Sequence, residues 1–95
     1  MSREEVLDKL RNIIIENNKD KEINLSMITE KSELVRDLSF DSMQMVYTAV
    51  LLEKEFNCKI DNEGYRNAKT IGDIIDLILN IKNWFSFYDI ETYIM

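Results

Sequence analysis

The fold is decided around one stretch near the middle of the chain, Asp37-Leu38-Ser39-Phe40-Asp41-Ser42-Met43. A long polar connection precedes this stretch, and the most apolar helical pattern of the sequence follows it. Asp41 is a favourable N-cap residue, so Ser42 is expected in the first turn of that helix. Unpaired backbone N–H groups and the helix dipole favour negative charge at such a position. A phosphate ester on Ser42 would therefore be stabilised.

The helix that begins at Ser42 is predicted to run to Phe56, and its apolar residues cover more than one face. The face expected in the core comprises Met45, Thr48, Ala49, Leu52 and Phe56. A second apolar group beside Ser42 comprises Met43, Val46, Tyr47 and Val50. This second group is either the edge of a widely buried helix or a docking surface for partner proteins.

Residues 2–18 are predicted to form an amphipathic helix. Ser2 and Glu5 have the spacing of a capping box, and Asn17-Asn18 can adopt the left-handed conformation that often ends a helix. The apolar face comprises Val6, Leu7, Leu10, Ile13 and Ile14.

The second half of the chain contains two more helical patterns. A short turn is predicted over Asn62–Asn67, weakened by Gly64, with Tyr65 as its anchor. The last clear helix spans residues 70–82 and begins with Thr70 and Asp73 at capping-box-like spacing, with Gly72 indicating a close backbone approach. Its apolar face comprises Ile71, Ile74, Ile75, Ile78 and Leu79.

The connection from Lys19 to Phe40 has no convincing periodicity and is long for a compact domain. Apolar residues spaced along it are predicted to anchor it against the helices, and a short turn is expected to start at Ser32-Glu33-Leu34. The anchors are Leu25, Met27, Ile28, Leu34, Val35 and Leu38.

Composition excludes several classes of function. The 95-residue chain has a net charge of −6, which argues against nucleic acid as a partner. It has no histidine and one cysteine, so the usual base for a catalytic serine or cysteine is missing and no zinc-type ligand set exists. Cys58 could be a reactive thiol, although only Lys59 beside it would lower its pKa. We therefore expect neither an enzyme nor a metal site. The lone cysteine and the absence of a long apolar run favour a cytoplasmic protein without a membrane span.

Asp-Leu-Ser-Phe-Asp-Ser-Met at residues 37–43 resembles the attachment motif of acyl carrier proteins, usually Asp-Leu-Gly-x-Asp-Ser-Leu. The match continues through Leu52–Phe56, Ile60 and Thr70–Ile75, and covers roughly residues 3–82. With the helical patterns, the resemblance implies an all-α, small four-helix carrier-protein bundle over residues 1–82. Three of its helices are long and the third is short, and a long first loop joins the first two.

Residues 83–95 have no counterpart in the usual carrier domain. They hold five of the nine aromatic residues and form an extra aromatic C-terminal tail, which is predicted to fold back on the bundle, to bind a partner or to make a dimer contact. A monomer is expected, with a dimer through this tail as the alternative.

The resemblance implies that Ser42 carries covalent 4′-phosphopantetheine, whose thiol holds an acyl group as a thioester. A phosphopantetheinyl transferase would install this arm from coenzyme A and make the chain a phosphoprotein, with Asp41 supporting the attachment. Acyl-loading and acyl-processing enzymes would be the further partners, docking on Met43, Val46, Tyr47, Val50 and Glu53. Alternatives are a peptidyl or aminoacyl carrier, and a carrier-like interaction module that is never modified.

The motif departs from the family pattern at several positions. Ser39 replaces the usual glycine, which adds strain if the position requires positive φ, and Met43 replaces leucine. Gln44, Tyr47 and Thr48 stand where many carriers of fatty-acid synthesis have acids. These departures favour a specialised fatty-acid, polyketide or related pathway.

Overall fold

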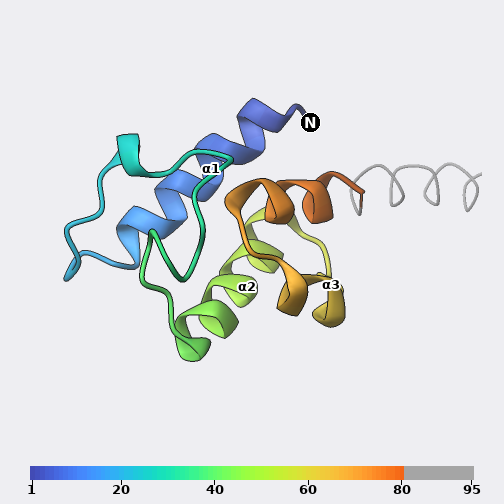
Figure 1. The fold of residues 1–95 in the computed structure, drawn as a ribbon. Helices are drawn as coiled ribbons and strands as arrows, with labels where there is room; N and C mark the ends of the chain where they lie inside the picture. The colour runs from blue at the N-terminus through green and yellow to red at the C-terminus, as the bar shows by residue number, and fades with distance from the viewer. Residues whose placement is uncertain (81–95) are drawn as a thin grey trace, which may run out of the picture.

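Helices joined by one long connection build the part of the chain that the computed structural model describes, residues 1–80 (Figure 1). Three α-helices are α1 (Arg3–Glu16), α2 (Ser42–Phe56) and α3 (Asn62–Asn67), and a 3₁₀ turn, η1, covers Leu25–Met27. A fourth helix covers residues 71–80. Extended pairing within residues 1–80 is limited to one antiparallel bridge between Glu33 and Thr70. The predicted all-α bundle of four helices is confirmed, whereas the predictions for residues 83–95 lie outside the described residues.

Helix α1 begins as the capping-box spacing predicts. The Glu5 backbone N–H donates to Ser2 Oγ at 3.2 Å, and the Ser2 N–H donates to Glu5 Oε1 at 3.3 Å. The helix ends at Glu16, before the predicted residue 18, and Asn17 has φ −98° rather than a left-handed conformation. The expected left-handed ending is wrong because side-chain amides satisfy the last carbonyls instead. Asn17 Nδ2 donates to the Ile13 carbonyl at 2.8 Å, and Asn18 Nδ2 donates to that of Ile14 at 2.7 Å.

The anchors predicted for the long connection divide into two groups. Ile28, Leu34 and Leu38 are fully buried, as expected. The prediction is wrong for Leu25, Met27 and Val35, whose exposed fractions are 56%, 39% and 69%. Apolar spacing without a helical or extended period does not show which side chains turn inward. Here Leu34 is buried while Val35, the next residue, is exposed.

Backbone hydrogen bonds hold the connection against the start of the fourth helix. The Leu34 N–H donates to the Lys69 carbonyl at 2.9 Å, and the Ile71 N–H donates to the Ser32 carbonyl at 3.0 Å. Gly72 adds a third bond at 2.8 Å to the Glu30 carbonyl, as its predicted close approach requires. The turn expected near Ser32 covers residues 34–38.

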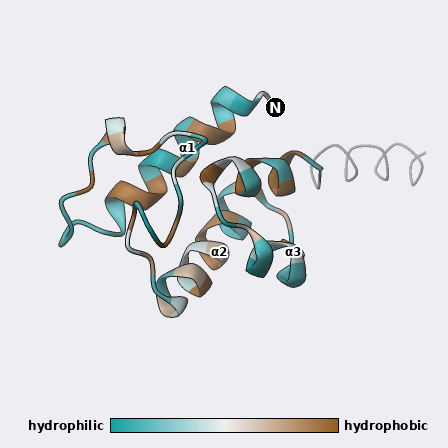
Figure 2. Ribbon diagram, in the orientation of Figure 1, coloured by the Kyte–Doolittle hydropathy of each residue, from teal (hydrophilic) through white to brown (hydrophobic). Residues whose placement is uncertain are grey.

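The core lies where α1, α2 and the fourth helix meet. Figure 2 shows α1 with apolar and polar positions alternating along the ribbon, as expected for a helix buried on one side. Thr48, Leu52 and Phe56 are buried on α2, with Met45 and Ala49 partly buried, so the predicted core face of this helix is confirmed. The other fully buried side chains on helices are Val6, Leu10, Ile14, Ile71, Ile74, Ile75 and Ile78.

The fourth helix begins with reciprocal bonds between Thr70 and Asp73. The Asp73 N–H donates to Thr70 Oγ1 at 3.1 Å, and Asp73 Oδ2 accepts from the N–H groups of Lys69 and Thr70 at 2.9 and 3.1 Å. These backbone donors hold the pKa of the Asp73 carboxyl below its ordinary value. None of the helices within residues 1–80 has the length and apolarity needed to cross a bilayer.

Candidate functional site

Ser42 is the first residue of α2 and is exposed. Asp41 precedes it as the N-cap, in the extended conformation, and Asp41 Oδ1 accepts from the Gln44 N–H at 2.8 Å. Gln44 Oε1 accepts in return from the Asp41 N–H at 3.2 Å, which completes a capping box. The start of the helix is therefore fixed on both sides of Ser42, while the Ser42 hydroxyl stays accessible.

The turn before Asp41 has a strained backbone. Ser39 has φ 57°, in the left-handed region that favours glycine, so the expected cost of serine at this position applies. Phe40 follows with an exposed fraction of 3% and anchors the turn in the core. Because the Phe40 side chain is held in the core, the turn leaves Asp41 and Ser42 facing solvent.

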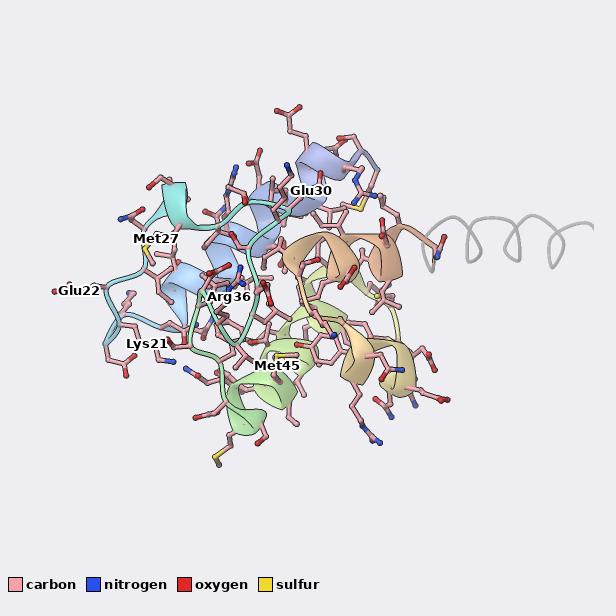
Figure 3. All side chains as sticks on the ribbon, in the orientation of Figure 1. Lys21, Glu22, Met27, Glu30, Arg36 and Met45 are labelled. Atoms are coloured by element: carbon pink, nitrogen blue, oxygen red, sulfur yellow. The ribbon has the colours of Figure 1, made fainter. Side chains whose placement is uncertain are left out.

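Side chains from the end of α1 and the following loop brace this turn. Lys21 Nζ, labelled in Figure 3, donates to the Ser39 carbonyl at 2.9 Å and to Gln44 Oε1 at 2.7 Å. Gln44 Nε2 donates to Asn18 Oδ1 at 2.7 Å. Gln44 thus links the capping box of α2 to the end of α1, and Lys21 links both to the strained turn.

A groove lies between α2 and α3, and Ser42 is one of the residues that line it. Its cavity has a volume of about 480 Å³. Its residues from α2 are Ser42, Met45, Val46, Ala49, Val50 and Glu53, and those from α3 are Asn62, Tyr65 and Arg66. Tyr65 closes the inner side, because its side chain is 7% exposed and its hydroxyl donates to the Met45 carbonyl at 2.8 Å. Burial raises the pKa of the Tyr65 phenol, which stays neutral at physiological pH.

Four apolar side chains beside Ser42 are exposed, and we call them the α2 apolar patch. Met43, Val46, Tyr47 and Val50 have exposed fractions of 82%, 65%, 55% and 50%. These four side chains are therefore not the edge of a widely buried helix, because at least half of each is exposed. Glu53 lines the groove together with Val46 and Val50 of this patch, but it is half-buried and accepts from the Ile60 N–H through Oε2 at 2.8 Å.

The sequence predicts Ser42 and Asp41 as site residues but not Gln44, Lys21, Asn18 or Arg66, which brace the turn or line the groove. The spacing of Asp41 and Gln44 matches a capping box and could have indicated Gln44. Lys21, Asn18 and Arg66 come from the preceding loop, the end of α1 and α3, and no local pattern relates them to Ser42.

The residues at the start of α2 fit a phosphate ester on Ser42. The hydroxyl is exposed, and the first-turn N–H groups of Ser42 and Met43 have no acceptor within the helix. The dipole of this 15-residue helix favours negative charge at the same end. Within this first turn there is no acidic residue after Asp41 to oppose such a charge.

Comparisons with known proteins agree on one family. Residues 8–78 match the model described as phosphopantetheine attachment site. The chain is 35% identical over 77 residues to an acyl carrier protein of Thermotoga maritima, with 81% of this chain and 91% of that protein covered. It is 33% identical over 78 residues to an acyl carrier protein of Lactobacillus acidophilus, covering 82% and 94% of the two chains.

Solved structures give the same result. An acyl carrier protein from Enterococcus faecalis superposes with a TM-score of 0.68 at 32% identity and covers 85% of this chain and 99% of that chain. The crystal structure of an acyl carrier protein from Thermotoga maritima gives a TM-score of 0.75 at 21% identity, covers 90% and 95% of the two chains, and shows the shared fold. The chain therefore belongs to the acyl carrier protein family, whose members are carriers rather than enzymes and bear covalently attached 4′-phosphopantetheine.

Proposed function

We propose that Ser42 is the attachment point of the 4′-phosphopantetheine arm and that the chain presents acyl thioesters to partner enzymes. The observation that carries this proposal is the exposed Ser42 hydroxyl at the start of α2, directly after the Asp41 cap. Ser42 supplies the oxygen of the phosphoester, and Asp41 keeps the first turn in place by capping it. The arm supplies a thiol that holds the acyl group and confines it near a docked enzyme at high effective concentration.

The test is intact-mass analysis after coexpression with a phosphopantetheinyl transferase. We expect the wild-type mass to rise by one phosphopantetheine and the mass of Ser42→Ala to stay unchanged. Ser32→Ala is a control, because Ser32 is a buried serine of the loop and its variant should still be loaded. Modification of Ser42→Ala would contradict the attachment site. Failure of several transferases to load folded wild-type protein would favour an unmodified interaction module.

We propose further that the protein serves a specialised fatty-acid, polyketide or related pathway, in the cytoplasm. Its support is the first turn of α2, which has no acidic residue, whereas many fatty-acid carriers are strongly acidic there. Intact-mass analysis of the protein isolated from its own cells would report the acyl group it carries. Recovery of ordinary fatty-acid intermediates alone would contradict this part of the proposal.

We propose that the α2 apolar patch is a docking surface for enzymes that load or process the arm. Its support is the exposure of Met43, Val46, Tyr47 and Val50 next to the proposed attachment point. Docking through apolar side chains depends weakly on salt, whereas docking through acidic side chains weakens as salt rises.

The transferase itself provides the docking test. Val46→Glu should raise the transferase KM at unchanged protein stability, because it places a charge in the centre of the patch. Glu55→Gln is a control on the same helix, since Glu55 is exposed outside the patch. A wild-type KM that rises steeply with salt, or an unchanged KM for Val46→Glu, would contradict apolar docking.

A further inference from the structure

The groove between α2 and α3 contains one cationic side chain, Arg66. Most of the groove is apolar, with Met45, Val46, Ala49 and Val50 contributed by α2. The chain as a whole has a net charge of −6, whereas the groove that Ser42 lines contains a positive charge, that of Arg66.

Arg66 is not engaged with any acid of the described chain. The ion pairs within residues 1–80 involve Arg3, Lys9, Arg11 and Arg36, and none involves Arg66. Glu53 is the acid among the residues that line the same groove, and its Oε2 accepts from the Ile60 N–H at 2.8 Å. The guanidinium fork of Arg66 is therefore available to an external anion, and such a fork matches the geometry of carboxylates and phosphates.

The contacts of α3 join the residue before Arg66 to the first turn of α2, where Ser42 lies. The start of α3 follows Ile60, whose N–H binds Glu53 in the last turns of α2. Later in α3, the Tyr65 hydroxyl binds the carbonyl of Met45, in the first turn of α2. Arg66 comes directly after Tyr65, and both Arg66 and Ser42 line this groove.

We propose that the Arg66 guanidinium binds an anion that is attached through Ser42. This inference rests on the proposed function, because it requires Ser42 to be modified. The anion has two sources with the same chemistry: the phosphodiester at the root of the arm and a carboxylate on the cargo. The phosphodiester would be bonded directly to Ser42, which lines the same groove as Arg66, so it is the expected source. A groove with one cation among apolar side chains would also retain an acyl chain that ends in a carboxylate better than an uncharged chain of equal length.

The experiment compares wild type with Arg66→Gln, each confirmed as fully loaded by intact mass. The ³¹P resonance of the arm's phosphodiester is recorded first for the free-thiol holo form. Both proteins are then loaded with butanoyl or with carboxylate-¹³C-labelled succinyl groups, which have the same number of carbon atoms. The ¹³C signal gives the pKa of the succinyl carboxylate, which a neighbouring guanidinium would lower.

We expect Arg66→Gln to move the ³¹P resonance with every cargo, which would identify the phosphodiester as the bound anion. A rise of the succinyl pKa in Arg66→Gln without a ³¹P change would support the site with the cargo carboxylate as its anion. Arg36→Gln is the matched control, because it removes the same charge from an exposed arginine (labelled in Figure 3) that pairs with Glu33 and Asp37 and does not line the groove. Equal ³¹P and ¹³C results for all three loaded proteins would overturn the inference, whereas failure to load wild type would contradict the proposed function instead.

Discussion

Ser39 and Asn57 are the two non-glycine residues within residues 1–80 that have positive φ, at 57° and 50°. Asparagine enters the left-handed region readily, whereas serine does so at a cost of about 1–2 kcal/mol. Ser39 lies in the turn that presents Asp41 and Ser42. The strain is therefore located at the proposed attachment point, where Lys21 and the buried Phe40 hold the backbone in place.

Ser39→Gly should raise the free energy of unfolding by about 0.5–1 kcal/mol, because glycine relieves the strain but adds entropy to the unfolded chain. Urea unfolding of the apo protein measures this difference. Asn57→Gly is the matched control at the other left-handed position and should gain less. An equal gain for both variants, or a loss for Ser39→Gly, would show that the turn is not strained by serine.

Among the helices, the start of the fourth one depends on a close backbone contact at Gly72. A Cβ there would lie 3.0 Å from the Glu30 carbonyl oxygen, a backbone atom that cannot turn aside. Gly72→Ala should therefore lower the free energy of unfolding by about 1–3 kcal/mol, the usual cost of overpacking. Thermal or urea unfolding provides the measurement.

Gly64→Ala is the control for this prediction. A Cβ at Gly64 would lie 2.8 Å from Leu77 Cδ2, the end of a side chain that can rotate away. Alanine also gains up to about 1 kcal/mol over glycine inside a helix, so this variant should stay close to wild type. A larger loss for Gly64→Ala than for Gly72→Ala would contradict the backbone argument.

The cap of the fourth helix makes stability depend on pH. The pKa of Asp73 is lowered in the folded state, so its stabilising contribution is present above the ordinary value of 3.8 and is lost as pH falls through the folded pKa. Asp73→Asn should have a lower free energy of unfolding than wild type at neutral pH. This difference between the two proteins should become smaller as pH falls below 3.8, the ordinary pKa.

Urea unfolding over a pH series measures the gap. Asp20→Asn serves as the control, since the side chain of Asp20 has no ion pair or hydrogen bond with another residue in the range 1–80. This variant should stay within about 0.5 kcal/mol of wild type throughout. If the difference in free energy of unfolding between Asp73→Asn and wild type does not change with pH, the ionised Asp73 carboxylate does not stabilise the helix start.

Sequence reasoning worked best for elements whose evidence is local. The spacing of Asp41 and Ser42 placed the start of α2, and Asn62–Asn67 was predicted as the short helix that α3 forms. It failed where the deciding contacts are distant, since nothing near Val35 in the sequence shows that this residue faces solvent while Leu34 and Leu38 are buried.

For the candidate site, the motif pointed to Ser42 because a capped helix start is a local pattern. The supporting groups could not be predicted, because the loop and α3 bring Lys21 and Arg66 to this region only when the bundle forms. A pattern that spans two packed elements leaves no periodic signal in the chain.

At the scale of the whole molecule, we propose that residues 1–82 are a complete carrier unit. Every buried apolar residue of the described core lies between Val6 and Ile78. A chain that ends at residue 82 should therefore unfold cooperatively and still be loaded on Ser42. Circular dichroism on heating and intact mass measure both properties. Loss of cooperative unfolding would show that residues 83–95 belong to the same folding unit.

The contact between the long connection and the fourth helix has a consequence for the order of folding. Leu34 binds the Lys69 carbonyl, and Ile71 binds that of Ser32, so these bonds join segments that are far apart in the chain. Helices form from local contacts, whereas closing so long a loop costs entropy before any bond repays it. We therefore expect the Glu33–Thr70 bridge to form after the folding transition state. Mutations at Gly72 should then chiefly increase the unfolding rate and leave the refolding rate nearly unchanged. A decreased refolding rate in stopped-flow kinetics would rule out this order of folding.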